Sequence, residues 1–558
     1  MNFCCPRNLL WFILCVLFLF VDTPVHSQEA SSSAAVVFVT SYLERGDAST
    51  TPRPEQISDA ISIFAAPGEY EPATFSIRAL QEFKTVQVEL AGDLEGQKGA
   101  KIPKAAVEIR LVDPFESWSK IKYEQFLLKK NRVDIPTGIT RRFWLTIHVP
   151  ENTKPGIYST KIAITAPVTE VGPDLGRLMT LKNLTYEVEV LPIKLLPARD
   201  TGMVFFMYHN TGYFPAELVT EEYQKRVFED MREHGLTTAT VYLYPVVDGT
   251  FTLTGRQEKH LGFSPTMNLL EETGLIAPGL PVIWLGAESY GEEVWKTILE
   301  EGKKQNWPEL IFYAVDEPGT EERNRQVRAF MQKFNAFRRK YPECKVRVTT
   351  ALGSSRGIQT VGHYYDLWIA CMAQETGESA VIADARMQKK ELWIYDCMLA
   401  PVAAETNRYY FGVWAWISGV KGCSHWAYFD GAPSLSYVYP SQDEIIPTIG
   451  WEAIREGIDD YRYLTTLKKI MEQARSLGKE DIIKDAEKIF TEVTTMVTMD
   501  NYGAAYHKAM RSGVDTAYQR PRVEPDLPIQ QYDKLRLKIA REIEKISRVI
   551  RTDLTKKE

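Results

Sequence analysis

The chain has 558 residues, of which 44% are hydrophobic and 25% are charged. This composition is ordinary for a globular protein and excludes an intrinsically disordered one. The formal net charge is -7, so we expect no nucleic-acid partner. The length predicts two to four domains.

The N-terminal segment has the features of a secretory signal peptide. Arg7 precedes an apolar run from Leu9 to Val21, and the segment closes with Val25-His26-Ser27. The run is shorter than the roughly 20 apolar residues that a membrane-spanning helix needs. We therefore predict a signal peptide over residues 1–27, a mature start near Gln28, a secreted or periplasmic protein, and no stable membrane insertion after cleavage.

Residues 28–198 carry short runs in which apolar and polar residues alternate, with many β-branched and aromatic side chains. A period of two is typical of strands that bury one face. Turn residues separate the runs and no long helical pattern interrupts them, so we predict an antiparallel β-sandwich. The clearest runs are Phe75–Arg78, Val86–Leu90, Phe143–Val149 and Tyr186–Val190.

Residues 199–477 have a different pattern, in which apolar strand-like runs alternate with amphipathic helical stretches. Eight such units predict a parallel sheet closed into a (β/α)8 TIM barrel, which makes the chain a multidomain α/β protein. The predicted strands are Met203–Tyr208, Thr238–Tyr244, Leu280–Leu285, Leu310–Val315, Lys345–Thr350, Leu367–Met372, Glu391–Tyr395 and Gly422–Phe429. The predicted helices include Thr220–His234, Glu292–Lys304, Glu321–Tyr341, Gly377–Gln388, Asn407–Val420 and Trp451–Leu477. Residues 478–558 are charged and predict a C-terminal helical extension.

Aromatic and acidic residues stand at the predicted carboxyl ends of the barrel strands, where barrel enzymes carry their active sites. Sugar rings have apolar faces and hydroxyl rims, so aromatic faces combined with carboxylates indicate a sugar site. Any one of these residues could instead simply fill the mouth of the barrel. The candidate substrate-binding residues are Tyr208, His209, Tyr244, Trp284, Tyr395, Asp396, Trp426 and Tyr428.

The adjacent carboxylates Asp316 and Glu317 are the candidate catalytic residues. Consecutive strand residues point to opposite faces, so two neighbours can share a cleft only where the strand gives way to a turn. Pro318 ends strand pairing at this point. The alternative is that both carboxylates complement the dipole of the next helix, but Glu321 and Glu322 already serve that purpose.

The sequence gives no indication of a metal site. The eight histidines are scattered without ligand spacing, which disfavours a metal-dependent hydrolase. Beyond the predicted signal peptide four cysteines remain, too far apart for a short-spaced zinc motif. They are Cys344, Cys371, Cys397 and Cys423, and we expect them to be buried in the barrel, with any disulfide pairing left open.

Several segments resemble glycoside hydrolase family 123 and the large, mostly uncharacterised domain family related to it. They are Tyr313–Pro318, Asn407–Trp416, Gly422–Asp430 and Trp451–Tyr463. The likeness extends over roughly residues 40–480, because members of the family have a β-sandwich before the barrel. The last of the four segments is the most distinctive, but it indicates ancestry rather than chemistry.

This resemblance implies hydrolysis of β-N-acetylgalactosaminides, with the acetamido group of the substrate acting as the nucleophile. Asp316 would orient that group and stabilise the oxazolinium intermediate, and Glu317 would protonate the leaving oxygen and later activate water. The expected partner is a glycan with a terminal amino sugar. No metal or other cofactor is implied.

Two alternatives remain open at this stage. A retaining glycosidase with a protein nucleophile would keep Glu317 as the acid and use Asp396 as the nucleophile. A non-catalytic glycan-binding protein would keep the aromatic cleft without activity, although the intact carboxylate pair argues against it. The preference between galacto and gluco sugars and the oligomeric state are also open, and Arg408 could bind an acidic sugar or form a structural salt bridge.

Overall fold

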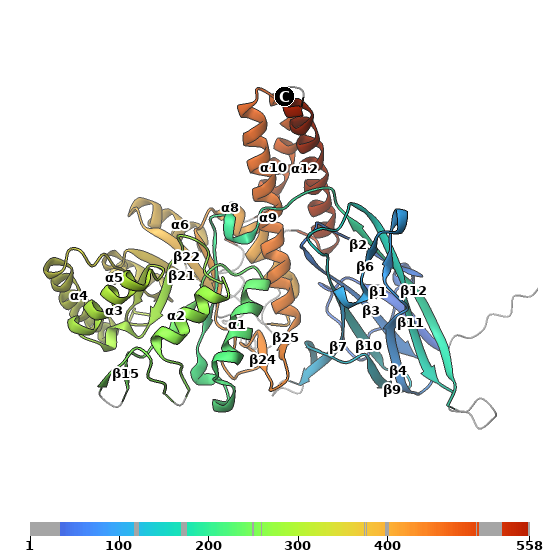
Figure 1. Cartoon of the computed structure of the whole chain (residues 1–558), viewed down its shortest axis with the longest axis horizontal. Coiled ribbons are helices and arrows are strands. Elements are labelled where there is room, and N and C mark those ends of the chain that lie inside the picture. Colours follow the sequence, from blue (N-terminus) through green and yellow to red (C-terminus); the bar gives the residue numbers. More distant parts are fainter. Residues whose placement is uncertain are drawn as a thin grey trace, which may run out of the picture.

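The computed structural model describes residues 34–116, 122–168, 176–247, 250–257, 259–372, 374, 376–396, 401–497, 499–500 and 527–555. The predicted signal peptide, the start near Gln28 and Cys397 lie outside the described residues. Figure 1 shows a two-sheet domain on one side, a barrel on the other, and two helices, α10 and α12, that project from the junction. No helix in the described part of the chain is long and apolar enough to cross a membrane.

The N-terminal domain consists of two sheets that share one hydrophobic core. One sheet has the order β1-β3-β10-β7-β8, and the other follows the path β2-β12-β11-β4-β9. The described pairs are antiparallel except β2 with β12, which is parallel. The strands are β1 (Ala35–Thr40), β2 (Ala60–Ala65), β3 (Tyr70–Ala79), β4 (Phe83–Leu90), β5 (Leu94–Glu95), β6 (Lys101–Ile102), β7 (Val107–Glu116), β8 (Lys122–Leu128), β9 (Arg132–Ile135), β10 (Thr140–His148), β11 (Gly156–Pro167) and β12 (Leu178–Val190).

The second domain is a closed parallel barrel with the strand order β19-β18-β17-β14-β13-β23-β22-β21-β20. β19 (Arg347–Thr349) and β20 (Ala351–Leu352) are successive pieces of the fifth strand. The first piece pairs with β18 and the second with β21, so this strand closes the barrel. The other strands are β13 (Val204–His209), β14 (Thr240–Tyr242), β17 (Val282–Leu285), β18 (Leu310–Tyr313), β21 (Leu367–Cys371), β22 (Glu391–Asp396) and β23 (Gly422–His425). The predicted fold class is confirmed.

The helices lie outside the barrel strands and at the C-terminus. Thr220, Thr320 and Thr448 cap α1, α4 and α9, because each hydroxyl accepts a hydrogen bond from the backbone N–H three residues later. The helices are α1 (Glu221–Glu233), α2 (Phe263–Glu272), α3 (Glu292–Gln305), α4 (Glu321–Lys340), α5 (Ser355–Val361), α6 (Glu378–Met387), α7 (Ala404–Tyr409), α8 (Ala415–Ser418), α9 (Ile449–Ser476), α10 (Lys484–Met496) and α12 (Tyr532–Thr555). Short hairpins join β15 (Val246–Val247) to β16 (Thr250–Phe251) and β24 (Val438–Pro440) to β25 (Ile445–Pro447).

Several predicted elements differ from the observed ones; the fourth strand, for example, ends at Tyr313 and not at Val315. The second strand is shorter than predicted and ends at Tyr242. The eighth ends at His425, because the chain then turns and the backbone N–H of Tyr428 donates to Tyr208 O at 3.0 Å. The helix predicted over 407–420 contains a π-helical turn, Tyr410–Trp414, between α7 and α8.

The interior of the barrel is filled by aromatic side chains in layers. Phe206 packs against Trp393 with ring centroids 5.5 Å apart, and Gly422 leaves room for this tryptophan. A Cβ at Gly422 would lie 2.5 Å from Trp393 Cγ. Above this layer Tyr208 contacts Tyr395, with centroids 6.1 Å apart. The centre of the barrel is therefore a packed floor, and ligands can enter only from its ends.

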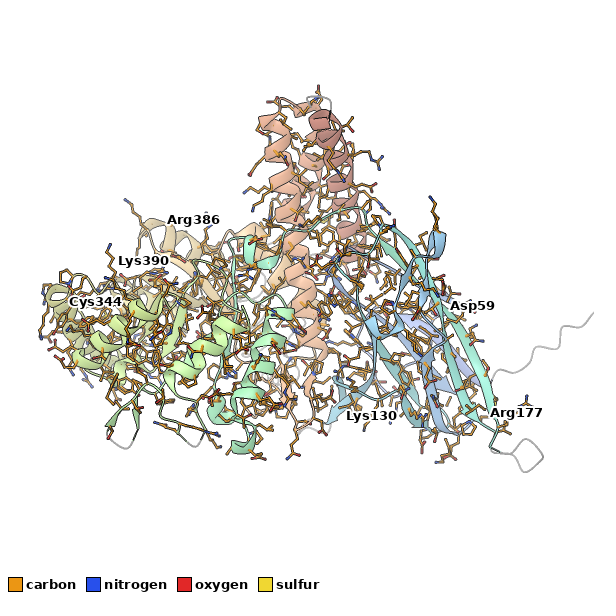
Figure 2. All side chains as sticks on the ribbon, in the orientation of Figure 1. Asp59, Lys130, Arg177, Cys344, Arg386 and Lys390 are labelled. Carbon is orange, nitrogen blue, oxygen red and sulfur yellow. The ribbon has the colours of Figure 1, made fainter. Side chains whose placement is uncertain are left out.

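The two ends of the barrel are easily distinguished in the figures. The β15–β16 hairpin follows β14 and marks the carboxyl ends of the strands (Figure 1). Arg386 and Lys390 precede β22, and Figure 2 shows them on the opposite side of the barrel from that hairpin. Barrel enzymes place catalytic residues at the carboxyl end, so the site is sought there.

A buried ion network joins the sandwich, α9 and α12. Arg536 Nη1 lies 2.7 Å from Glu456 Oε2 and 3.0 Å from Glu71 Oε2, and its Nε lies 2.7 Å from Asp460 Oδ1. All four side chains are buried. Glu456 and Asp460 belong to the distinctive Trp451–Tyr463 segment, whose side chains thus serve to dock the domains.

Arg408 belongs to the same network and is not a sugar ligand. Its side chain is fully buried, with Nε 2.7 Å from Asp460 Oδ2 and Nη1 2.8 Å from Asp533 Oδ1. Of the two roles that the sequence left open for Arg408, binding of an acidic sugar and a structural salt bridge, the structure shows the salt bridge. The reason is that the helix beginning at Ala404 packs against α9 rather than facing the barrel mouth.

Candidate active site

The predicted carboxylate pair lies on a strained turn directly after β18. Val315 has φ 58° and Glu317 has φ 42°, both in the left-handed region that non-glycine residues rarely adopt. A β-branched residue in this region is costly and persists only where the surroundings impose it. The twist on both sides of Asp316 breaks strand alternation, which allows two consecutive carboxylates to face one cavity.

Neighbouring side chains bind the carbonyl oxygens of this turn. Thr350 Oγ1 donates to Val315 O at 2.8 Å, and the hydroxyl of Tyr365 donates to Ala314 O at 3.1 Å. Arg323, in the first turn of α4, donates to the carbonyl of Asp316. The backbone is fixed in this way, and the two carboxylates remain exposed.

Each carboxylate has its own tyrosine donor. The hydroxyl of Tyr313 donates to Asp316 Oδ1, and the hydroxyl of Tyr395 donates to Glu317 Oε1. Burial, with Tyr208 and Asp316 nearby, holds the pKa of Tyr313 well above its ordinary value, so this residue donates as a neutral hydroxyl. Because each carboxyl group has a separate donor, the two hydrogen bonds orient the two groups independently.

These groups line a cavity of about 430 Å³ at the carboxyl end of the strands. Its size falls within the range of small-molecule pockets. Five of the twelve lining residues are aromatic and three are acidic. The lining consists of Tyr208, Tyr242, Leu285, Gly286, Glu288, Tyr313, Asp316, Glu317, Ala351, Tyr395, Trp426 and Leu435.

Five of the predicted site residues meet in this cavity. Asp316 and Glu317 lie together with Tyr208, Tyr395 and Trp426. The rings of Tyr208 and Trp426 are 5.5 Å apart, so the tryptophan directly after the eighth strand lies beside the tyrosine of the first strand. Aromatic faces therefore lie beside the carboxylates, as the sequence predicts.

The other predicted residues lie elsewhere, and strand alternation explains three of them. Trp284 is fully buried behind β17, where its Nε1 donates to Leu243 O at 2.8 Å. His209 points towards α1 and pairs with Gln224 Oε1 at 2.8 Å, and burial lowers its pKa to about 4. Asp396 is fully buried, on the opposite face of β22 from Tyr395.

Tyr428 and Tyr244 are absent from the cavity lining because the strands end earlier than predicted. The hydroxyl of Tyr428 donates to Asp230 Oδ2 of α1 at 2.7 Å, so this residue packs between the barrel and its helices. Tyr244 lies two residues beyond β14, with its ring 4.4 Å from that of His260. The geometry therefore does not support the prediction that Tyr428 and Tyr244 bind substrate.

The structure adds Tyr242, Tyr313 and Glu288 to the site. Tyr242 and Tyr313 are the last residues of their strands, so correct strand ends would have identified them. Glu288 lies in the short loop after β17. Burial raises the pKa of Glu288, and the neighbouring Asp316 adds to this effect. The sequence could have indicated Glu288, because it is an acidic residue three positions after the end of a barrel strand.

Within the described ranges, no group of three or more His, Cys, Asp and Glu side chains is arranged to hold a metal ion. Cys344, Cys371 and Cys423 are buried, as expected. The cavity itself is lined by carboxyl groups and tyrosine hydroxyls.

The barrel thus carries a carboxylate pair and several aromatic side chains at its carboxyl end. Residues 52–166 match the family model described as the glycoside hydrolase 123 N-terminal domain. The structure is also similar to a family 123 glycoside hydrolase from Clostridium perfringens, with a TM-score of 0.60 and 12% identity over 94% of this chain and 100% of that one. The predicted resemblance to family 123 is confirmed: the family model matches the N-terminal domain, and the solved structure shares the fold.

Two further solved structures match with lower TM-scores. Chitinase ChiW from Paenibacillus matches with a TM-score of 0.27 and 9% identity, over 78% of this chain and 43% of that one. An endoglucanase of the GH5-4 type from Clostridium longisporum matches with a TM-score of 0.31 and 11% identity, over 47% of this chain and 97% of that one. A search of curated protein sequences finds no match.

Proposed function

We propose that this protein is a retaining glycoside hydrolase that removes a terminal β-linked N-acetylgalactosamine from a glycan. The observation that carries the proposal is the pair Asp316 and Glu317, each oriented by its own tyrosine in an aromatic cavity. The Clostridium perfringens structure, described as explaining glycolipid glycan hydrolysis, supports a glycan substrate. The galacto preference rests on the family resemblance.

In the proposed reaction the acetamido oxygen of the substrate attacks the anomeric carbon while the glycosidic C–O bond breaks. Glu317 transfers its proton to the leaving oxygen. Asp316, held by Tyr313, accepts a hydrogen bond from the acetamido N–H and balances the positive charge of the oxazolinium. Glu317 then takes a proton from a water molecule as this water attacks the anomeric carbon. The attack breaks the C–O bond of the oxazolinium ring and releases a sugar of retained configuration.

The position of Asp396 counts against the alternative with a protein nucleophile. Its side chain is fully buried and lies on the other face of β22 from the cavity. A nucleophile must reach the anomeric carbon to about 3–3.5 Å, which this side chain cannot do without rearrangement of the strand. A non-catalytic glycan-binding protein would need neither the strained turn nor two oriented carboxylates.

A panel of chromogenic β-N-acetylhexosaminides and plain hexosides tests the proposal. We expect turnover of the acetamido sugars and almost none of an otherwise identical glycoside that lacks the acetamido group. Glu317→Gln should lose orders of magnitude in rate on poor leaving groups but less on activated aryl glycosides, whereas Asp316→Asn should damage every substrate. A thiazoline mimic of the cyclic intermediate should inhibit strongly. Brisk turnover of a plain hexoside would refute the mechanism.

We also propose that the chain is exported. The apolar segment from Leu9 to Val21 and the closing Val25-His26-Ser27 support cleavage near Gln28. Amino-terminal sequencing of the protein recovered outside the cytoplasm should begin close to that residue. Retention of Met1 in the recovered protein would contradict cleavage.

A further inference from the structure

The chain segment that follows β23 forms one wall of the catalytic cavity. Its first residue, Trp426, and Leu435 both line the cavity, and we call the segment Trp426–Leu435 the wall loop. The indole of Trp426 is half-buried, with its ring centroid 5.5 Å from that of Tyr208 and 6.3 Å from that of Tyr213. The wall loop therefore presents a large aromatic side chain to a ligand in the cavity.

The carboxyl group of Asp430 joins this tryptophan to the rest of the wall loop. Trp426 Nε1 donates a hydrogen bond to Asp430 Oδ2 at 3.1 Å. The backbone N–H of Ala432 donates to the other oxygen, Oδ1, at 2.8 Å, and Ser436 Oγ lies 3.1 Å from that oxygen. Both oxygens thus act as acceptors, which a carboxylate can do and an amide cannot. Asp430 itself does not line the cavity, so it can act on a ligand only through its neighbours.

Backbone contacts hold the wall loop in place independently of Asp430. The backbone N–H of Trp426 donates to Asp396 O at 2.8 Å. From the sandwich, the buried Gln125 donates through Nε2 to Pro433 O at 2.9 Å. These contacts fix the main chain but not the side-chain torsions of Trp426. The hydrogen bond to Asp430 is directional and therefore sets the orientation of the indole plane.

We propose that Asp430 is a positioning residue that holds the indole of Trp426 in the orientation in which it contacts the reacting sugar. The inference rests on the proposed function, which supplies the sugar. The indole is apolar except for its N–H, and Asp430 satisfies that group outside the cavity, so the apolar ring remains for the C–H groups of the sugar. Because the ring is oriented before the sugar arrives, binding does not have to immobilise it.

Asp430→Asn tests the proposal because it keeps the size of the side chain and changes one acceptor into a donor. The amide oxygen can still accept from the N–H of Ala432, which leaves the amide nitrogen facing the indole N–H. Two donors cannot bind each other, so the indole should rotate. On an aryl N-acetyl-β-D-galactosaminide we expect KM to rise about tenfold and kcat to stay within about threefold of the wild-type value, because the ring contacts the sugar in the ground state and the transition state alike.

Asp430→Ser provides a second variant that leaves the turn of the loop intact. A serine hydroxyl can still accept from the N–H of Ala432, two residues later, but it supplies no second oxygen for the indole. KM should again rise about tenfold. Ser436→Ala is the matched control, because it removes a loop contact of Asp430 Oδ1 and leaves the hydrogen bond of the indole in place. Its KM should stay within about twofold of the wild-type value.

The Trp426→Phe background separates positioning of the indole from stability of the loop. Phenylalanine keeps an aromatic ring but lacks the N–H, so Asp430→Asn should change KM in this background by about twofold at most. A role of Asp430 in loop folding alone would give the same loss in both backgrounds. That result, or a wild-type KM in both Asp430→Asn and Asp430→Ser, would overturn the proposal.

Calorimetric binding of N-acetyl-D-galactosamine to the same variants distinguishes this proposal from the proposed reaction. If the wild type does not hydrolyse the aryl glycoside but binds the sugar, and Asp430→Asn weakens binding about tenfold only when Trp426 is present, the reaction fails and the role of Asp430 stands. If the wild type hydrolyses the aryl glycoside but both Asp430 variants leave KM and binding unchanged, the reaction stands and the role of Asp430 fails. A wild type that neither hydrolyses the glycoside nor binds the sugar would overturn both.

Discussion

Gly353 controls the position of the proposed acid, and Gly353→Ala tests this directly. A Cβ at this position would lie 3.0 Å from both Cδ and Oε1 of Glu317. Ordinary contacts of a Cβ begin near 3.4 Å, so the carboxylate must move by a few tenths of an ångström. The φ of Gly353 lies outside the left-handed region, so the new methyl group adds no backbone strain of its own.

The expected cost follows from this displacement. A misplacement of 1 Å costs about a hundredfold in rate, so a shift of a few tenths should lower kcat about tenfold, or roughly 1.4 kcal/mol. The hydrogen bond from Tyr395 to Glu317 opposes the shift and transmits part of it to the cavity wall. The loss should be greater on poor leaving groups, because their departure depends on the acid.

Steady-state kinetics on an aryl glycoside and on an oligosaccharide measure the effect, and thermal unfolding measures stability. Gly92→Ala is the control, because nothing lies within 4 Å of a Cβ at that position. Both variants should keep the melting temperature within about 2 °C of the wild type. Wild-type kcat on both substrates in Gly353→Ala would refute the placement of Glu317 as the acid.

Three further predictions concern the buried groups. Arg536→Met leaves Glu456, Glu71 and Asp460 without their shared cation, so urea unfolding should show a loss of about 3–5 kcal/mol, and a loss below 1 kcal/mol would contradict the network's role. Burial and the nearby Asp459 raise the pKa of Glu69 from its ordinary 4.5 to about 8. The folded state therefore binds this proton more tightly than the unfolded state, so the free energy of unfolding should fall as pH rises from about 5 to about 8, and Glu69→Gln should flatten that dependence. Because Asp396 is fully buried, Asp396→Asn should keep kcat within a few-fold of the wild-type value. Labelling of the wild type should give no peptide in which a sugar is covalently bound to Asp396, and finding one would support the alternative with a protein nucleophile.

Local sequence was enough to predict the fold class and to single out the two carboxylates that line the cavity. Apolar and polar residues alternate along Tyr186–Val190, because every second side chain of a strand faces the core. The burial of side chains along β12 shows the same alternation. The pair Asp316 and Glu317 could be singled out because Pro318 limits the strand and adjacent carboxylates need a turn to act together. These features depend only on neighbours in the chain.

Tertiary structure decided which side chains reach the cavity. Tyr208 and His209 are consecutive, and only the position of α1 determines that the tyrosine faces the cavity and the histidine faces the helix. The strand ends at Tyr242 and His425 depend on pairing with neighbouring strands, which no local pattern encodes. Arg408 could not be assigned from the sequence, because its partner Asp533 lies 125 residues away. Contacts between distant segments therefore determined the roles that the sequence alone left open.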